Sequence, residues 1–310
     1  MVVESGKWIV DSKKELSTIH FPLPTTWRQL IEEALCQLES AGVSEAGLNA
    51  EYLAMAAMNV SSRAALRANL DEIVTDAERK TFSRLVIRRA AREPLQYIIG
   101  EWEFFGLPLF VSKGALIPRP ETEILVEESL AEANAMGGNI TILDLGTGSG
   151  AIALALASRL EFALVAGIDK SDAALTVAEE NRKRLDLSNV HFENADIMSG
   201  GWIDRFTHKV DLLVSNPPYV SLAEYEALEP ELREHEPREA LTDESTGLTF
   251  YQRIAEIAPK LLTPRGRLLV ELGFGLAGPV SEIMRGAGME VLRIADDLAG
   301  IPRVLVARAE

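Results

Sequence analysis

Cysteine and long apolar runs are nearly absent from this sequence. Its 310 residues include a single cysteine, Cys36, so the chain forms no internal disulfide, as is typical of proteins in a reducing cytoplasm. The longest uninterrupted apolar run, residues 151–157, is far too short to cross a bilayer, and the first residues hold no apolar core of signal-peptide length. We therefore expect a cytoplasmic protein without membrane contact, in which Cys36 packs within an apolar helical face.

Basic residues are in the minority. The chain has 31 Lys and Arg against 47 Asp and Glu, which gives a formal net charge of −16 at pH 7. Binding a polyanion requires clustered basic side chains that displace counterions, so this balance favours a protein or small-molecule substrate over a nucleic acid. Residues 224–244 are densely acidic, and we interpret them as a solvated face, with a docking surface for a partner as the alternative.

Length and composition indicate two globular domains. Hydrophobic residues make up 47% of the sequence and charged residues 25%, and 310 residues suffice for two cores of ordinary size. Residues 1–24 show no periodicity and are expected to form an extension. We expect a helical domain over 25–94, a hairpin linker over 95–113 in which the aromatic residues pack, and an α/β domain over 114–310.

The predicted helical domain has two clear helix starts. Thr26 with Gln29 and Thr75 with Glu78 form capping boxes. Apolar residues at helical spacing predict a small bundle with helices over 27–42, 45–58, 61–68 and 76–93. Because the domain offers no nucleophile, metal-ligand spacing or glycine loop, we expect it to recognise the substrate, with plain structural support as the alternative.

The second domain alternates strands with helices. This order predicts a mostly parallel sheet with helices on both faces, and the short final connection adds one antiparallel strand. The expected strands span residues 140–145, 163–168, 190–193, 211–215, 267–272, 289–294 and 303–308, and the expected helices span 116–136, 150–160, 171–186, 249–262 and 277–287.

A glycine-rich turn follows the strand over 140–145 and reads Gly146-Thr147-Gly148-Ser149-Gly150. Glycines let the backbone turn tightly and approach a ligand closely, and the next helix presents free amide groups. The dinucleotide fingerprint has two residues between its second and third glycines, whereas this turn has one. The turn therefore favours an adenosine-sulfonium cofactor over NAD.

Acidic residues follow the next two strands. Asp169 ends the strand over 163–168, where it is placed to accept hydrogen bonds from both ribose hydroxyls of such a cofactor. Asp196 follows the strand over 190–193, where its carboxylate can accept from an adenine amino group while Ile197 makes an apolar contact with the ring. Each acid alone is typical of a turn or cap, but their positions after consecutive strands favour cofactor binding.

The strand over 211–215 ends in Asn216-Pro217-Pro218-Tyr219. The two prolines stiffen this turn, and the carbonyl groups of the Asn216 side chain and the Pro217 backbone can accept both hydrogens of one planar NH2 group. The Tyr219 ring offers a face for stacking. We interpret these four residues as a catalytic and substrate-binding clamp, with an inert proline turn as the alternative.

Seven motifs together resemble those of one enzyme family. They read Glu93-Pro-Leu-Gln-Tyr, Gly100-Glu-Trp-Glu-Phe-Phe, Leu116-Ile-Pro-Arg-Pro-Glu-Thr-Glu, Asp144-Leu-Gly-Thr-Gly-Ser-Gly, Asn216-Pro-Pro-Tyr, Glu236-Pro-Arg-Glu-Ala-Leu and Asp297-Leu-Ala-Gly. With them the chain resembles the class I S-adenosylmethionine-dependent methyltransferases and, more narrowly, the protein-(glutamine-N5) methyltransferases that modify peptide chain release factors. The resemblance covers roughly residues 27–308.

This resemblance implies a fold, a substrate and site residues. The expected fold is a Rossmann-like, mostly parallel sheet, joined through the hairpin to a helical domain that recognises class 1 release factors. The implied reaction methylates the glutamine of a Gly-Gly-Gln loop, converts S-adenosyl-L-methionine to S-adenosyl-L-homocysteine, and needs no metal. Nothing in the sequence demands more than a monomer. Residues 146–150, Asp169, Ile197 and Asn216 are implied to contact the cofactor, and residues 216–219 the glutamine amide.

The inferred mechanism is a direct displacement in which the clamp orients the amide lone pair. No general base is evident, and the four histidines, His20, His191, His208 and His235, are expected to be surface or structural residues. Two alternatives remain open. An N6-adenine DNA or RNA methyltransferase would use the same clamp for an adenine amino group, and a non-catalytic adaptor would use the helical domain to bind a translation factor.

Overall fold

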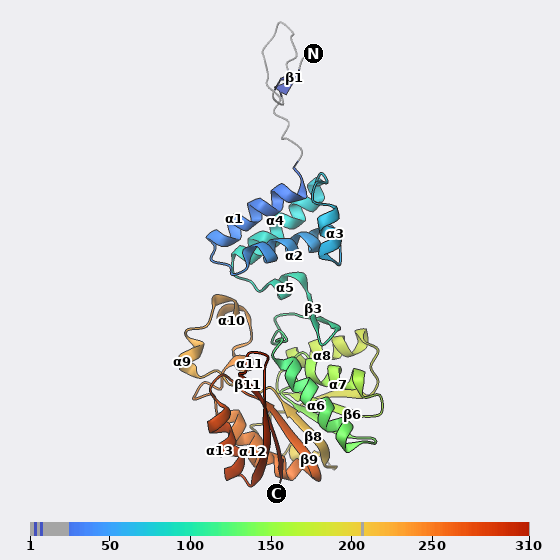
Figure 1. Ribbon diagram of the computed structural model, residues 1–310, viewed down its shortest axis with the longest axis vertical. Coiled ribbons are helices and arrows are strands. Elements are labelled where there is room, and N and C mark those ends of the chain that lie inside the picture. The colour runs from blue at the N-terminus through green and yellow to red at the C-terminus, as the bar shows by residue number, and fades with distance from the viewer. Residues whose placement is uncertain (1–2, 5–6, 9–24, 206–207, 310) are drawn as a thin grey trace. The chain divides into compact units, whose positions relative to one another are not determined.

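The computed structural model describes residues 3–4, 7–8, 25–205 and 208–309 (Figure 1). Most of the extension predicted over residues 1–24 lies outside the described residues, except for two paired strands, β1 (Val3–Glu4) and β2 (Lys7–Trp8). The chain divides into two compact units, Met1–Ile98 and Ile99–Glu310. Each unit is described separately below.

The first unit is a bundle of four helices, as the periodicity predicted. They are α1 (Trp27–Ser40), α2 (Ala46–Met58), α3 (Arg63–Ala68) and α4 (Asp76–Ala90), and both predicted capping boxes are present at the starts of α1 and α4. The ring of Trp27 meets that of Phe82 edge to face, with centroids 5.7 Å apart, which joins α1 to α4 in the core.

Cys36 corrects one expectation, because its side chain is exposed. The buried face of α1 is formed by Trp27, Leu30, Ala34 and Leu38. Cys36 is two residues beyond Ala34, which turns it by about 200° around the helix at 3.6 residues per turn. The apolar pattern of α1 was read correctly, but Cys36 lies on the opposite face.

Helix α5 (Leu95–Ile99) spans the division between the units, and a hairpin follows it in the second unit. Its strands β3 (Glu101–Phe104) and β4 (Leu107–Phe110) pair antiparallel around Phe105 and Gly106, both of which have positive φ. Phe104 and Leu109 are buried in the same core cluster as the strands of the large sheet. The hairpin is therefore part of the second unit.

The second unit contains a seven-stranded sheet in the order β10-β11-β9-β8-β5-β6-β7, which confirms the predicted α/β class (Figure 1). Strand β11 runs opposite to the other six strands, as the short final connection predicted. The strands are β5 (Thr141–Leu145), β6 (Leu164–Asp169), β7 (Val190–Asn194), β8 (Val210–Ser215), β9 (Leu262–Glu271), β10 (Met289–Asp296) and β11 (Pro302–Ala309).

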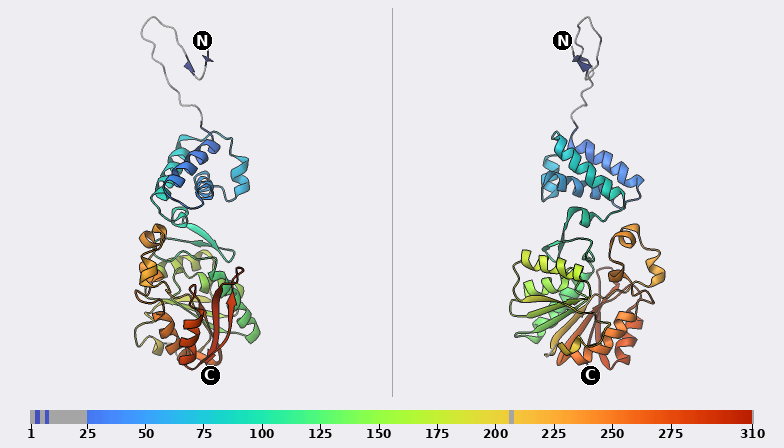
Figure 2. Two further views of the ribbon diagram at one scale, coloured as in Figure 1. Left: turned by 60° about the vertical axis from the view of Figure 1, so that its left-hand side comes forward. Right: turned by 180° about the vertical axis from the view of Figure 1, so that it is seen from behind.

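Helices cover both faces of this sheet, which fans out in Figure 2. One buried cluster packs α6 (Thr122–Met136) and α7 (Ala151–Arg159) against the sheet, and α8 (Asp172–Arg184) contacts β6 and β7. A second buried cluster packs α12 (Thr249–Leu261) and α13 (Ala277–Gly286) against the sheet. Both faces of the central strands are therefore buried, which explains their continuous apolar sequences.

The long connection between β8 and α12 has its own local structure. It contains α9 (Leu222–Tyr225), α10 (Pro230–His235) and α11 (Arg238–Leu241), and a 3₁₀ turn (Ile203–Arg205) precedes β8. Helix α10 buries none of its residues, which agrees with a solvated acidic face. Tyr225, Glu236 and Leu241 are buried, so the acidic segment as a whole is anchored to the domain.

The strand order reverses between β5 and β8. From β5 the chain proceeds outward to β6 and β7, whereas from β8 it proceeds the other way, to β9. Parallel sheets bind ligands at the carboxyl ends of the strands beside such a reversal, because the two following connections leave on opposite faces. Leu145 and Ser215 are register partners there, and the Ser215 Oγ donates to the Leu145 carbonyl oxygen at 2.8 Å.

Candidate active site

The glycine-rich turn after β5 is held by its own hydrogen bonds. Gly146 and Thr147 both donate their amide N–H to the Ile168 carbonyl at 2.9 Å, and Gly146, Gly148 and Gly150 all have positive φ. A Cβ on Gly150 would lie 2.9 Å from the Phe192 ring, whereas a Cβ on Gly148 would meet no atom within 4 Å. The turn is tightly packed at Gly150 and open at Gly148.

Asp144 precedes this turn and is completely buried. Its Oδ2 accepts a hydrogen bond from the Thr147 hydroxyl at 2.7 Å. Burial is the largest influence on this carboxyl and raises its pKa to about 7, against the opposing hydrogen bonds from Thr147 and the Ala153 amide. Asp144 therefore anchors the turn through Thr147, and its burial favours the protonated carboxyl.

Asp169 at the end of β6 also contacts the glycine turn. Its Oδ2 accepts from the Gly148 amide and its Oδ1 from the Ser171 amide, both at 2.9 Å. Burial raises the pKa of Asp169, although these two amides oppose the shift. Each carboxylate oxygen has a second lone pair, so Asp169 keeps acceptor capacity toward the cavity that it lines.

Asp196 and Ile197 follow β7 and line the same cavity. The Asp196 Oδ1 accepts from the Met198 amide at 2.9 Å, and Ile197 is 8% exposed. Arg253 of α12 holds this loop by donating to the Ile197 carbonyl at 2.8 Å. Phe250, one turn earlier on α12, also lines the cavity, which the sequence did not reveal.

The clamp lies across the strand reversal from the glycine turn. Asn216, Pro217 and Pro218 line the cavity together with Leu145, Gly146 and Gly148. The Asn216 Nδ2 donates to the Thr122 Oγ1 at 3.0 Å. Because its nitrogen is used in this way, the Asn216 side chain retains its Oδ1 as a hydrogen-bond acceptor.

Tyr219 is placed differently from the other three clamp residues. It is not among the residues that line the cavity, and its ring packs on the backbone of Gly273, where a Cβ would lie 2.8 Å from Tyr219 Cδ2. Its hydroxyl donates to Glu271 Oε1 at 3.4 Å, and burial raises its pKa. Tyr219 is therefore oriented by contacts beneath the clamp.

Two motifs that had no role at the sequence level form another wall of the cavity. Leu116, Pro118 and Arg119 line it before α6, and Pro237, Glu239 and Ala240 line it at α11. Glu236 joins the two segments, because its Oε1 accepts from Arg119 Nη2 at 2.5 Å and its Oε2 accepts from the Ile117 amide at 3.2 Å. The pairing could not be read from either motif alone.

The cavity fits an adenosyl sulfonium cofactor. Apolar side chains of Leu145, Ile152, Ile197 and Phe250 supply surfaces for a flat base and an alkyl chain. Polar acceptors are present at Asp169 and Asp196, and the open backbone at Gly148 permits close approach. All but one of the predicted cofactor residues line this one cavity, namely 146–149, Asp169, Asp196, Ile197 and Asn216. The exception is Gly150, whose packing shapes the turn.

Other expectations concern residues outside the cavity. His191 and His208 are exposed and His235 is partly buried, while His20 lies outside the described residues. Within the described part of the chain, no group of three or more His, Cys, Asp or Glu is placed to hold a metal ion. Among the helices of the described residues, none has the length and apolar character needed to cross a membrane.

Comparison with known proteins places both units in sequence families. The PrmC N-terminal domain model matches residues 29–100, and a methyltransferase domain model matches residues 137–274. The release factor glutamine methyltransferase of Fusobacterium nucleatum is 40% identical over 271 residues, which cover 87% of this chain and 75% of that protein. The release factor glutamine methyltransferase of Geobacter sulfurreducens is 40% identical over 288 residues, 92% of this chain and 98% of that protein.

Proposed function

This chain belongs to the family of release factor glutamine methyltransferases, and we propose that it methylates the glutamine of the Gly-Gly-Gln motif in class 1 peptide chain release factors, using S-adenosyl-L-methionine. The similarity spans both units and supports methylation of a release factor glutamine. The choice of motif and of methyl donor is an inference from the resemblance and from the cavity.

The orientation of Asn216 is the observation that carries this proposal. Its nitrogen is engaged by Thr122 at 3.0 Å, so the Oδ1 and the neighbouring Pro217 carbonyl are the acceptors that the clamp offers. Two acceptors on one stiff turn match the two hydrogens of a primary amide. Both residues line the same cavity as the glycine turn, so a substrate amide and a cofactor methyl group would meet there.

The clamp would catalyse transfer by orientation and charge stabilisation. S-adenosyl-L-methionine supplies an electrophilic methyl group whose bond to sulfur breaks as the bond to the amide nitrogen forms. Asn216 and Pro217, by accepting both N–H hydrogens, would turn the nitrogen lone pair toward that methyl group and stabilise the positive charge that develops on nitrogen. One of these hydrogens then leaves as a proton, which restores a neutral amide.

We assign the remaining roles by unit. Residues 114–310 would carry catalysis, with residues 146–150, Asp169, Asp196 and Ile197 holding the cofactor, and Asn216, Pro217, Pro218 and Tyr219 holding the glutamine. The helical domain, residues 25–94, would recognise the release factor, and the match of residues 29–100 to the PrmC N-terminal domain supports this role. The hairpin segment, 95–113, would connect recognition to catalysis.

The test is methyl transfer from labelled S-adenosyl-L-methionine to a purified class 1 release factor. Label is expected on the wild-type factor and not on a version whose motif is Gly-Gly-Ala, and Asn216→Ala should lower the rate by at least about a hundredfold. Asp211→Asn is the matched control. Asp211 is the second residue of the same strand, β8, and accepts hydrogen bonds from the Thr141 amide and the Thr263 hydroxyl, at the end of the strand opposite to the clamp.

Three results would overturn the proposal. Label on unmethylated DNA with none on the factor would identify an N6-adenine methyltransferase. Binding of the factor without any transfer, together with no affinity for S-adenosyl-L-homocysteine, would identify a non-catalytic adaptor. Label on a Gly-Gly-Ala factor would show that a different residue of the release factor is the target.

A further inference from the structure

A buried carboxylate lies beneath the clamp and has no role in the mechanism described so far. Glu271 ends β9 and is 1% exposed. Its Oε1 accepts from the Tyr219 hydroxyl at 3.4 Å, while its Oε2 is buried without a hydrogen bond of standard geometry. Burying a carboxylate is costly unless hydrogen bonds or opposite charges compensate it, and one oxygen of Glu271 has no hydrogen-bond partner.

Thr122 stands between this carboxylate and the clamp. It lies in the first turn of α6 and is 4% exposed. Its Oγ1 accepts from Asn216 Nδ2 at 3.0 Å, and Thr122 lowers the pKa of Glu271 against the larger, raising effect of burial. A hydroxyl group has one hydrogen to donate. If Thr122 donates this hydrogen toward Glu271, its oxygen accepts from Asn216, and if it donates the hydrogen to Asn216, none is left for Glu271.

We propose that Glu271 and Thr122 are positioning residues that determine which side of the Asn216 amide faces the substrate. An ionised carboxylate can only accept, so the buried Oε2 of Glu271, which has no other hydrogen-bond partner, would take the hydroxyl hydrogen of Thr122. The Thr122 oxygen must then accept from Asn216, which directs the nitrogen of Asn216 inward and its Oδ1 toward the cavity. This inference rests on the proposed function, because only a substrate that presents an NH2 group requires an acceptor at that position.

Protonation of Glu271 would remove this constraint. A protonated carboxyl can donate to Thr122, whose hydroxyl can then donate to the Asn216 Oδ1. The amide could turn and present its NH2 group to the NH2 group of the substrate, and two donors facing each other do not bind. The clamp is therefore expected to require the ionised form of Glu271.

The surroundings of Glu271 allow this change near neutral pH. The ionisable and hydroxyl groups that face it are Glu121 and Thr122 at the start of α6, Tyr219, Tyr251 of α12, and Arg303 of β11. Burial is the largest influence and raises the pKa of Glu271 to about 7, with Glu121 raising it and Thr122, Tyr219 and Arg303 lowering it.

The activity test uses saturating cofactor and the release factor substrate across pH 5.5 to 8.5. For the wild-type protein, kcat should rise with an apparent pKa near 7, and Glu271→Gln should lose this limb and be slower at pH 8 by about tenfold. Thr122→Val should lose a similar factor, whereas Thr122→Ser keeps the hydroxyl and should stay within about threefold of wild type. Asp211→Asn, the control, should retain both rate and limb.

A second readout is independent of activity. In protein labelled with ¹⁵N-asparagine, the side-chain NH2 signal of Asn216, assigned by its loss in Asn216→Ala, should shift with an apparent pKa near 7. The shift should disappear in Glu271→Gln, whose retained binding of S-adenosyl-L-homocysteine would show that it is folded. A shift that persists in Glu271→Gln would overturn the proposal, since another group would then be titrating.

The outcomes also separate this inference from the proposed function. If the wild-type protein methylates the factor but Glu271→Gln and Thr122→Val both match it in rate and pH profile, the positioning role is wrong and the function stands. If Thr122→Ser is as slow as Thr122→Val, the hydroxyl is not the operative group. If the wild-type protein does not label the factor, the proposed function fails, and the ¹⁵N titration still decides the orientation of Asn216.

Discussion

Glu236 and Arg119 form an ion pair at 2.5 Å although 117 positions of sequence separate them. The Glu236 side chain is 1% exposed and the Arg119 side chain 28% exposed. The second Glu236 oxygen accepts from the Ile117 amide. Since both segments line the cavity, this one carboxylate links two of its walls.

Glu236→Gln is expected to weaken both stability and cofactor binding. The variant loses the charge of a buried pair and can accept with only one oxygen, so the free energy of unfolding should fall by about 1–3 kcal/mol. The dissociation constant for S-adenosyl-L-homocysteine should rise, because only one of the two contacts that join the segments would remain. Urea unfolding and isothermal titration calorimetry measure the two effects.

The neighbouring pair Arg238 and Glu244 provides the control. Their side chains are 47% and 65% exposed, and an exposed pair contributes about 0–1 kcal/mol. Glu244→Gln should therefore leave both stability and cofactor affinity nearly unchanged. Equal effects of Glu236→Gln and Glu244→Gln would contradict the linking role of Glu236.

Gly150→Ala should destabilise the protein by about 2–4 kcal/mol. The residue has φ of +80°, and a Cβ would lie 2.9 Å from Phe192 Cζ and 3.0 Å from Leu154 Cδ1. Gly288, which follows the last turn of α13, is the control, because it has φ of +75° but nothing within 4 Å, so Gly288→Ala should cost only about 1 kcal/mol. Comparing the urea midpoints of the two variants separates the cost of steric overlap from the cost of backbone strain.

Gly148→Ala should act on cofactor binding more than on stability. Gly148 has φ of +56° and no atom within 4 Å of its would-be Cβ, yet it lines the cavity. We expect a stability loss of about 1 kcal/mol, like that of Gly288→Ala, with at least about a tenfold rise in the dissociation constant for S-adenosyl-L-homocysteine. Wild-type affinity in this variant would place the cofactor elsewhere.

The stability of the protein should depend on the protonation of Glu271. Its folded-state pKa of about 7 exceeds the ordinary value of 4.5, so between these pH values the folded protein binds more protons than the unfolded chain. The free energy of unfolding contributed by this group therefore falls as pH rises through that window and is constant above it.

The difference in unfolding free energy between wild type and Glu271→Gln isolates this effect. It should fall, on the order of 2–3 kcal/mol, between pH 5 and pH 8, as the wild type acquires a buried charge that the variant lacks. Asp144, whose pKa is also raised to about 7, is present in both proteins and cancels in the difference. A difference that does not change with pH would mean that Glu271 has the same pKa folded and unfolded.

Local sequence patterns determined the elements of the fold and the positions of the two motif turns. The capping boxes at Thr26 and Thr75 act within a single turn of helix, and the glycine and proline turns depend on the backbone preferences of their own residues. The alternation of strands and helices then placed both turns at the carboxyl edge of the sheet, because right-handed crossovers leave few other arrangements.

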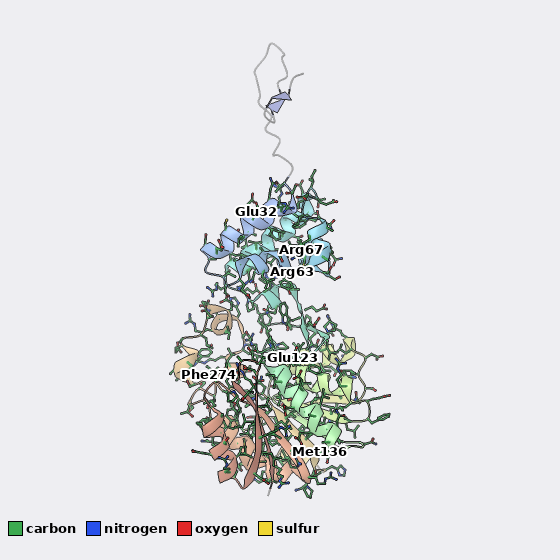
Figure 3. The ribbon with its side chains drawn as sticks, in the orientation of Figure 1. Glu32, Arg63, Arg67, Glu123, Met136 and Phe274 are labelled. Atoms are coloured by element: carbon green, nitrogen blue, oxygen red, sulfur yellow. The ribbon has the colours of Figure 1, made fainter. Side chains whose placement is uncertain are left out.

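Tertiary structure decided which side chains support those turns. Thr122 and Phe250 occupy ordinary helical positions in the sequence. Glu271 ends an apolar strand, and the loop that follows this strand contains Phe274, which Figure 3 labels. Their roles depend on contacts across the sheet and between its layers, such as that of Asn216 with Thr122, 94 positions apart. Periodicity reports which face of an element is buried, whereas the partner of a buried polar group is determined only when the elements pack.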